Sequence, residues 1–174
     1  MGISELMPIR FERPDDAEKI RAVNVSAFGT SAEADLIEAL RCVVRPLISL
    51  VAEEDRTIVG HILFSPITLS SDPDVRIAGL APMAVTPAYQ RQGIGSALVR
   101  AGLEECRSAG FVAVAVLGHS AFYPRFGFVP ASRFGIASTY AVPDDVFMAL
   151  ELDAGALRDK PGVVHYHSAF AGVS

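Results

Sequence analysis

Residues 90–96 are the part of the chain best suited to binding chemistry, because two glycines there join an apolar run to a helical pattern. The apolar run at 80–85 predicts a buried strand, and the pattern from Gly93 to about Ala109 predicts a helix. At such a turn several backbone N–H groups point outward together, and the helix dipole behind them favours negative charge. The sequence therefore predicts a site for a phosphate or diphosphate.

Several kinds of phosphate site can be compared with this turn. A nucleotide triphosphatase loop needs Lys and then Ser or Thr after its second glycine, whereas Gly95 is followed by Ser96 and Ala97. A dinucleotide-binding turn needs a small residue where Leu98 stands and an acid after the next strand, but residues 111–118 contain no acid. Both patterns fail. The remaining alternative to a ligand site is a tight turn into a helix with no binding role.

A proline and a tyrosine near the turn favour a ligand site. Pro82 lies inside the apolar strand, where its missing N–H interrupts the ladder and marks a bulge. A bulge there would splay this strand from the next one and open a wedge between them. Tyr123 follows the second strand, near the mouth of that wedge. We expect a long ligand with a phosphate head and an arm that carries an acyl group.

The surrounding sequence must supply a sheet that holds these residues. Residues 80–117 form a strand–helix–strand pattern, which implies a parallel pair with a right-handed crossover. Residues 47–53 and 58–69 flank a polar turn and predict an antiparallel hairpin. The whole pattern predicts a mixed α/β or α+β fold, in which strands outnumber helices. The expected strands are 9–12, 47–53, 58–69, 76–85, 111–117, a strand near 128, 146–152 and an edge strand at 163–167; the expected helices are 15–28, a second helix capped by Thr30 or Ser31, 93–109 and 121–126.

These motifs together resemble the GNAT superfamily of N-acetyltransferases. The likeness is closest to bacterial stand-alone members that carry a Gly-His-x-x-x-Tyr-Pro-x-Phe-Gly-Phe segment, here residues 118–128. It is carried by residues 77–128 and is weaker outside them. The resemblance implies the acyl-CoA N-acyltransferase fold, with a mostly antiparallel splayed sheet flanked by helices in one domain over residues 1–174. It also implies acetyl-CoA as cofactor and a primary amine as acceptor.

The resemblance assigns roles to individual residues. It implies that main-chain amides of the turn bind the diphosphate of acetyl-CoA and that the preceding strand pairs with the pantetheine arm. The cofactor-binding residues would be Met83, Ala84, Val85, Gln90, Arg91, Gln92, Gly93, Ile94, Gly95 and Ser96. Tyr123 matches the family tyrosine that protonates the departing thiolate. The N–H of Val85 or its neighbour would stabilise the oxyanion.

The general base is less clearly marked, because residues 80–85 lack the glutamate that some family members place there. Candidates are Glu33 or Asp35 on the second helix, His61 on the hairpin and His119 beside the short helix. A water chain is the alternative. We interpret His61 as a core histidine because its neighbours are apolar, and we keep His119 and Glu33 beside Tyr123 as the catalytic candidates.

Four other residues receive brief interpretations. Cys106 lies deep in the helix after the turn, so we do not expect a covalent acetyl-cysteine route. His165 and His167 share a strand face but have no evident third ligand, so we expect no metal. Arg125 is interpreted as facing solvent, with the cofactor phosphates as the alternative.

Composition limits the partners and the location. The net charge of −5 argues against nucleic acid as the main partner, and no apolar stretch has the roughly 18 residues of a membrane helix. Cys42 and Cys106 lie in helical patterns, which favours a cytoplasmic protein over a disulfide-bonded one. The apolar C-terminal strands leave a homodimer possible.

Three function classes remain distinguishable by experiment. The leading one is an acetyl-CoA-dependent N-acetyltransferase acting on a small amine, amino acid, antibiotic, peptide N-terminus or protein lysine. The alternative is a non-catalytic acyl-CoA-binding or regulatory module, and the third is an interaction domain that binds no acetyl-CoA.

Overall fold

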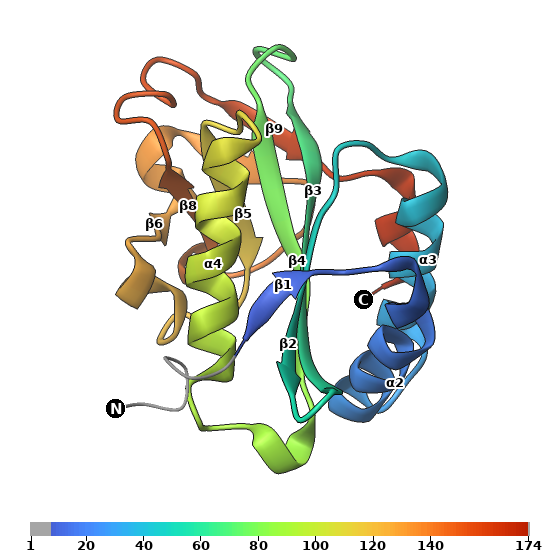
Figure 1. Cartoon of the computed structure of the whole chain (residues 1–174). Helices are drawn as coiled ribbons and strands as arrows, with labels where there is room; N and C mark the ends of the chain where they lie inside the picture. The colour runs from blue at the N-terminus through green and yellow to red at the C-terminus, as the bar shows by residue number, and fades with distance from the viewer. Residues whose placement is uncertain (1–7, 174) are drawn as a thin grey trace.

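The computed structural model describes residues 8–173, which form a nine-stranded mixed sheet between helical layers (Figure 1). The strands are β1 (Ile9–Phe11), β2 (Ile48–Glu54), β3 (Thr57–Leu69), β4 (Ile77–Val85), β5 (Ala113–Leu117), β6 (Val129–Pro130), β7 (Ile136–Ser138), β8 (Phe147–Glu151) and β9 (Gly162–His165). The α-helices are α2 (Ala17–Phe28), α3 (Ala32–Val43) and α4 (Ile94–Ser108). The 3₁₀ helices are η1 (Pro14–Asp16), η2 (Pro87–Tyr89), η3 (Tyr123–Phe126), η4 (Ala131–Phe134), η5 (Asp144–Val146) and η6 (Ser168–Gly172).

The main path of the sheet runs β1-β2-β3-β4-β5-β8-β6, and every pair along it except β4–β5 is antiparallel. The β2–β3 hairpin turns at Asp55 and Arg56, which both have positive φ, as a tight turn between twisted strands requires. The chain from β4 through α4 to β5 makes the parallel pair. The predicted mixed, mostly antiparallel sheet is therefore confirmed.

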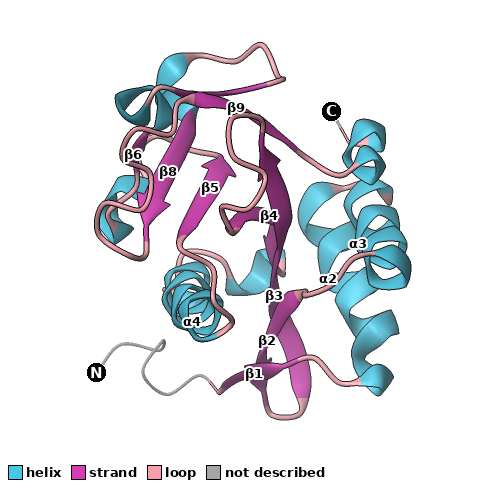
Figure 2. Cartoon of the chain, turned by 90° about the horizontal axis from the view of Figure 1, so that it is seen from above, coloured by secondary structure: helices cyan, strands magenta, loops and turns pink. Residues whose placement is uncertain are grey.

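Helices cover both faces of the sheet, α4 on one side and α2 with α3 on the other (Figure 2). On the α4 side, Leu98 packs in one buried cluster with Phe64 of β3 and with Phe128. On the opposite side, Ile20 of α2 and Leu40 of α3 pack in a second buried cluster. Among residues 8–173, no helix has the length and apolar character needed to span a membrane.

Some local expectations were wrong. The segment predicted as an edge strand is β9, which pairs with both β3 and β7 and so has neighbours on two sides. The short strand β7 was not predicted at all. Ser31 precedes α3 at the capping position, but its hydroxyl does not cap the helix and instead contacts Asp35. These errors share one cause, because each of the three features depends on contacts with groups that are distant in the sequence or that compete for the same hydroxyl.

Candidate active site

Strands β4 and β5 separate halfway along β4. Their pairing covers only Ile77–Leu80 opposite Ala113–Val116. Immediately beyond, Ile62 of β3 faces Met83 and Phe64 faces Leu80, so β4 has one more residue than β3 between these pairs. The extra residue falls at Ala81–Pro82, which confirms the bulge predicted at Pro82. The rest of β4 therefore has a free edge on the side that β5 has left.

The backbone groups on this free edge can be assigned from the β3–β4 ladder. The N–H of Thr86, the residue after β4, donates to the carbonyl of Val59 on the β3 side. Because successive residues of a strand direct their polar groups to opposite edges, Val85 and Met83 present theirs to the free edge. Ala84 is instead opposite His61, and its side chain is buried under α2 and α3. Its amide is thus used by β3.

The turn after β4 leads directly into α4. Gly93 occupies the N-cap position with φ 87°, and Arg91 has φ 64°, so the chain reverses through left-handed conformations that Gly93 adopts without steric cost. The side-chain amide of Gln90 donates to the carbonyl of Val85 at 2.9 Å and ties the turn to the strand. The first amides of α4 are left without helical partners, as at any helix N-terminus.

The free edge and the turn line one cleft of about 950 Å³. Its walls contain Leu80, Ala81, Met83 and Val85 of β4; Tyr89, Gln90, Arg91, Gly93, Ile94, Gly95 and Ser96 around the turn; Leu117, Gly118, His119, Ala121, Phe122, Tyr123 and Arg125 after β5; and Phe28 of α2. Most of the residues assigned to cofactor binding are thus brought together. Ala84 and Gln92 do not line the cleft; the Gln92 side chain turns back to the carbonyl of Ala88 at 3.4 Å.

Tyr123 begins η3 and forms part of the cleft wall. It is only 6 % exposed, and its ring packs edge-on against Phe122 at 5.0 Å and Phe128 at 5.6 Å. A side chain at Gly118 would overlap the tyrosine ring, so this glycine is required for the position of Tyr123. Burial raises the pKa of Tyr123 to about 12, because the phenolate loses its hydration. The hydroxyl therefore keeps its proton at neutral pH.

The candidate bases His119, Glu33 and Asp35 differ in their position relative to the cleft. His119 is exposed and lines the cleft, and its carbonyl accepts from the N–H of Phe122 at 3.0 Å. Glu33 is partly buried near the start of α3, does not line the cleft and is 3.4 Å from the Thr30 hydroxyl. Asp35, also on α3, pairs with Arg21 at 2.9 Å.

His61 is fully buried between the sheet and α2, as expected for a core histidine. Its ring nitrogens lie 2.9 Å from the Ser49 hydroxyl and 3.3 Å from the Asn24 amide. Because the Asn24 contact is made by its NH2 group, which can only donate, Nδ1 accepts and Nε2–H donates to Ser49. Burial, and secondarily the charge of Arg41, lowers the pKa of His61 to about 3, so the ring is neutral and has no access to the cleft.

Three residues set aside in the sequence lie away from the cleft. Cys106 is fully buried, and burial raises its pKa to about 12, so its thiol is not a nucleophile at neutral pH. His165 lies on β9, whereas His167 lies beyond that strand and accepts from the N–H of Ala169 at 3.0 Å. The two histidines therefore do not share a strand face as predicted. Within residues 8–173 no cluster of three or more metal-ligating side chains occurs.

Among the cleft residues that the sequence did not single out, four line its walls beside Tyr123 or opposite the turn. Phe28 is 42 % exposed at the end of α2, and Phe122 is in reach of both Gly95 and Tyr123. Leu117 and Gly118 end β5 where it leaves β4. Only Gly118 carried a signal, since it begins the segment that contains Tyr123. Arg125 is exposed, as expected, and it also lines the cleft.

The splayed sheet, the bulged strand and the phosphate-type turn define the acyl-CoA N-acyltransferase class of fold. The sequence model of the acetyltransferase (GNAT) family matches residues 16–128. The uncharacterized N-acetyltransferase YjhQ of Escherichia coli K12 is 43 % identical over 134 residues, which is 75 % of this chain and 74 % of YjhQ. The uncharacterized N-acetyltransferase YhbS of the same strain is 35 % identical over 165 residues, which is 94 % of this chain and 98 % of YhbS.

Solved structures give the same result. The crystal structure of the Escherichia coli GNAT family N-acetyltransferase YhbS in complex with CoA is similar with a TM-score of 0.90 and 33 % identity, covering 97 % of this chain and 93 % of that one. A GNAT family acetyltransferase from Brucella melitensis in complex with acetyl-CoA is similar with a TM-score of 0.76 and 37 % identity, covering 94 % and 97 %. This chain belongs to the GNAT acetyltransferase family.

Proposed function

We propose that this protein transfers an acetyl group from acetyl-CoA to a primary amine by direct attack of the amine. The observation that carries this proposal is the single cleft in which the free edge of β4 continues into the turn at Gly93, with Tyr123 in its wall. The solved structures of two similar GNAT family members are complexes, one with CoA and one with acetyl-CoA. Acetyl-CoA supplies an acetyl group activated as a thioester.

The residues of the cleft fit this cofactor. The left-handed N-cap at Gly93 exposes the first amides of α4 to a diphosphate, which the dipole of α4 also favours. The outward-facing groups of Met83 and Val85 can pair with an amide-containing arm as an added strand would. The Gly95 position has room, since a Cβ there would only be in ordinary contact with Met83 and Phe122.

Each catalytic step can be assigned to a group in the cleft. His119 would accept a proton from the amine, which at a pKa of about 10.4 is mostly charged at neutral pH. Of the two free-edge N–H groups, those of Met83 and Val85, the one that the arm leaves unpaired would stabilise the negative charge that develops on the carbonyl oxygen. Tyr123 would donate its proton to the leaving thiolate. Between the two candidate bases, we prefer His119 to Glu33 because only His119 lines the cleft.

We also propose a domain organisation, a location and an oligomeric state. We keep a single domain for residues 1–174, supported by one sheet that links β1 to β9. The two free cysteines favour a cytoplasmic protein. The homodimer stays a prediction for sedimentation analysis; β8 and β9 already pair on both sides within the chain, so it would have to use their side-chain faces.

The proposal is tested with Tyr123→Phe, which removes the hydroxyl and keeps the ring. We expect kcat for acetyl transfer to fall by about 10²- to 10⁴-fold, the usual contribution of a general acid. The dissociation constant of acetyl-CoA should stay within about twofold of wild type, because the ring packing is unchanged. Thiol release over an amine panel gives kcat, and calorimetry gives binding.

The two readouts separate the function classes. Acetyl-CoA binding without amine-dependent thiol release would favour the non-catalytic acyl-CoA-binding module. No acetyl-CoA binding at millimolar concentration would contradict the whole proposal. An active enzyme with unchanged kcat in the Tyr123→Phe variant would remove only the assignment of Tyr123.

A further inference from the structure

We infer that Arg125 binds the 3′-phosphate of coenzyme A and makes the cleft prefer CoA over its 3′-dephospho form. This inference rests on the proposed function and extends it to a residue outside the strand and turn that receive the rest of the cofactor. It assigns a ligand to a charged side chain that the transfer chemistry does not use.

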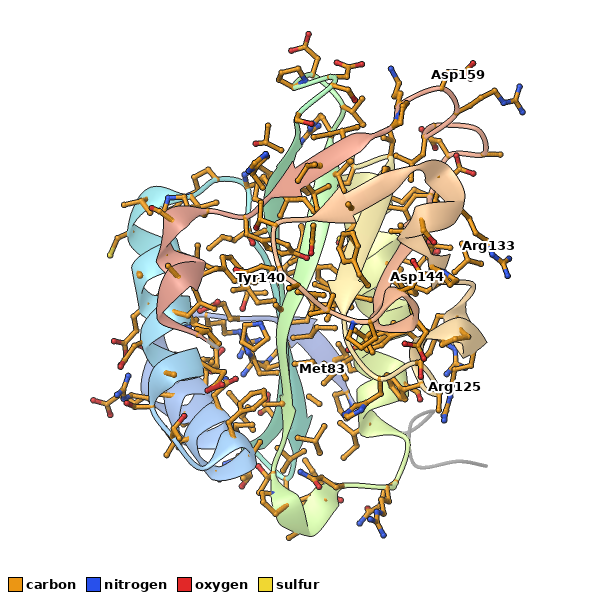
Figure 3. The ribbon with its side chains drawn as sticks, turned by 180° about the vertical axis from the view of Figure 1, so that it is seen from behind. Met83, Arg125, Arg133, Tyr140, Asp144 and Asp159 are labelled. Carbon is orange, nitrogen blue, oxygen red and sulfur yellow. The ribbon has the colours of Figure 1, made fainter. Side chains whose placement is uncertain are left out.

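Arg125 lies close to the phosphate turn although it is on η3. It lines the same cleft as Gly95 and Ser96. Its guanidinium lies 4.9 Å from the centre of the Phe122 ring, and that ring is within contact range of a Cβ placed on Gly95. The Phe122 ring thus lies between the guanidinium of Arg125 and the first turn of α4. Figure 3 shows Met83 on β4 in the middle of the molecule and Arg125 at its periphery.

The charge of Arg125 is not neutralised within the described protein. None of the described residues that line the cleft is acidic. Arg125 is exposed and does not take part in any ion pair within residues 8–173. The stacking on Phe122 holds the guanidinium beside the cleft without using its hydrogen-bond donors. The guanidinium of Arg125 can therefore bind an anion in the cleft.

The chemistry of coenzyme A supplies a third phosphate at a suitable distance. The diphosphate would be bound by the amides of the turn and by Arg91, which line the same cleft. The 3′-phosphate is attached to the same ribose ring as the diphosphate, so it lies one sugar ring away from it. As a monoester with a second pKa near 6, it carries close to two negative charges at neutral pH. Arginine binds such a group through charge-assisted hydrogen bonds.

The chain offers a matched control in Arg100. Its guanidinium lies 5.1 Å from the centre of the neighbouring Phe126 ring, so it makes the same kind of cation–π contact. Arg100 is exposed on α4 but does not line the cleft. Arg125→Ala and Arg100→Ala therefore each remove one positive charge and one cation–π contact, and only Arg125→Ala removes a cation that lines the cleft.

The test measures binding of CoA and 3′-dephospho-CoA by calorimetry, at low and at physiological salt. We expect wild type to bind CoA about five- to tenfold more tightly than 3′-dephospho-CoA, with a smaller ratio at higher salt. Arg125→Ala should bind both with the wild-type affinity for 3′-dephospho-CoA, so the ratio falls to about one. Arg125→Lys should restore part of the ratio, and Arg100→Ala should keep all of it. Circular dichroism and thermal unfolding establish that each variant is folded.

Two results would overturn the inference while leaving the acetyltransferase proposal intact. One is a wild-type protein that binds both compounds equally well. The other is an Arg125→Ala variant that keeps the ratio or weakens both compounds equally, which would place Arg125 at the diphosphate or the adenine. Failure of wild type to bind either compound at millimolar concentration would instead contradict the proposed function itself.

Discussion

The position of the Tyr123 ring depends on Gly118, which has no side chain. Phe122 and Phe128 hold its ring edge-on from two sides, and Gly118 leaves open the space that the ring occupies. A ring held in this way keeps its hydroxyl in one place, which a proton donor needs because proton transfer tolerates little change in distance. Burial keeps the phenol protonated, with its pKa raised to about 12.

Replacing Gly118 by Ala tests this dependence without touching Tyr123. The new Cβ would overlap the ring, so the ring must shift or the strand end must move. We expect kcat to fall at least tenfold and stability to fall by about 1–3 kcal/mol, as in overpacked cores. Binding of acetyl-CoA to the turn should change little. Steady-state kinetics, calorimetry and urea unfolding measure these three quantities.

The control is Gly172→Ala, where a Cβ meets nothing within 4 Å and φ is not in the left-handed region. It should resemble wild type in all three measurements. A folded Gly118→Ala variant with wild-type kcat would show that the position of the Tyr123 ring does not limit catalysis.

At the scale of elements, β4 is used in two ways along its length. Its first half is paired on both sides, by β3 and β5, and its second half is paired by β3 alone. Pro82 lies at the change from one half to the other and contributes no N–H to either edge. The free edge is short and lies inside a cleft, which protects it from pairing with another protein.

Amide hydrogen exchange on β4 tests whether the cofactor arm adds to this edge. Adding CoA in excess should slow exchange of the Met83 and Val85 amides by about tenfold or more, because binding protects groups that it covers. The Ala84 amide, which is directed to His61, should already exchange slowly without CoA. Residue-resolved NMR gives the three rates, and Ala84 is the internal control.

The expected result is an alternation, in which CoA slows exchange at Met83 and Val85 but leaves Ala84 unchanged. Equal protection of the three amides would indicate a general stiffening of the strand. No change at Met83 and Val85 in a protein that binds CoA would mean that the arm does not pair with β4.

At the scale of the whole molecule, His61 joins the helical layer to the sheet. The ring on β3 contacts Asn24 of α2 and Ser49 of β2, and all three residues are buried. The pKa of the histidine falls to about 3 in the folded protein and is near 6.5 in an unfolded chain. The unfolded state therefore binds the extra proton between these two values, so the free energy of unfolding falls as pH falls from about 6.5 towards 3.

Urea unfolding between pH 7 and 4.5 tests this linkage. The histidine alone should contribute a slope approaching 1.4 kcal/mol per pH unit in wild type. His61→Leu should lose that contribution, while its stability at pH 7 falls by about 1–3 kcal/mol because Ser49 and Asn24 lose a partner. The exposed His165→Leu is the control and should keep the wild-type slope.

The two carboxylates whose pKa is lowered titrate below this pH window. Hydrogen bonds from Arg10 hold the pKa of Asp16 below its ordinary 3.8, and Lys160 does the same for Asp72. Their contribution to stability is lost only as pH falls through those lowered values, and it is the same in all three proteins. Equal slopes in wild type and His61→Leu would contradict the neutral buried histidine.

The sequence by itself determined the glycine turn at 90–96, the bulge and the order of the main elements. Gly93, Gly95 and Pro82 act through local backbone geometry, so their consequences can be derived from neighbouring residues alone. The helices and the long strands followed from apolar periodicity, which reflects which face is buried. The segment at 118–128 marked Tyr123 through its resemblance to a family, and the family assignment is confirmed by the family model and the relatives.

Only the tertiary structure decided which residues share the cleft and which edges are free. The strand β9 is not at an edge because two distant segments pair with it, and short β7 exists only through that pairing. Ala84 lies among the predicted cofactor residues in sequence, yet the ladder directs its amide to β3. Phe28 and Arg125 reach the cleft from elements more than 90 residues apart. Such contacts depend on how whole layers pack, and no local pattern encodes them.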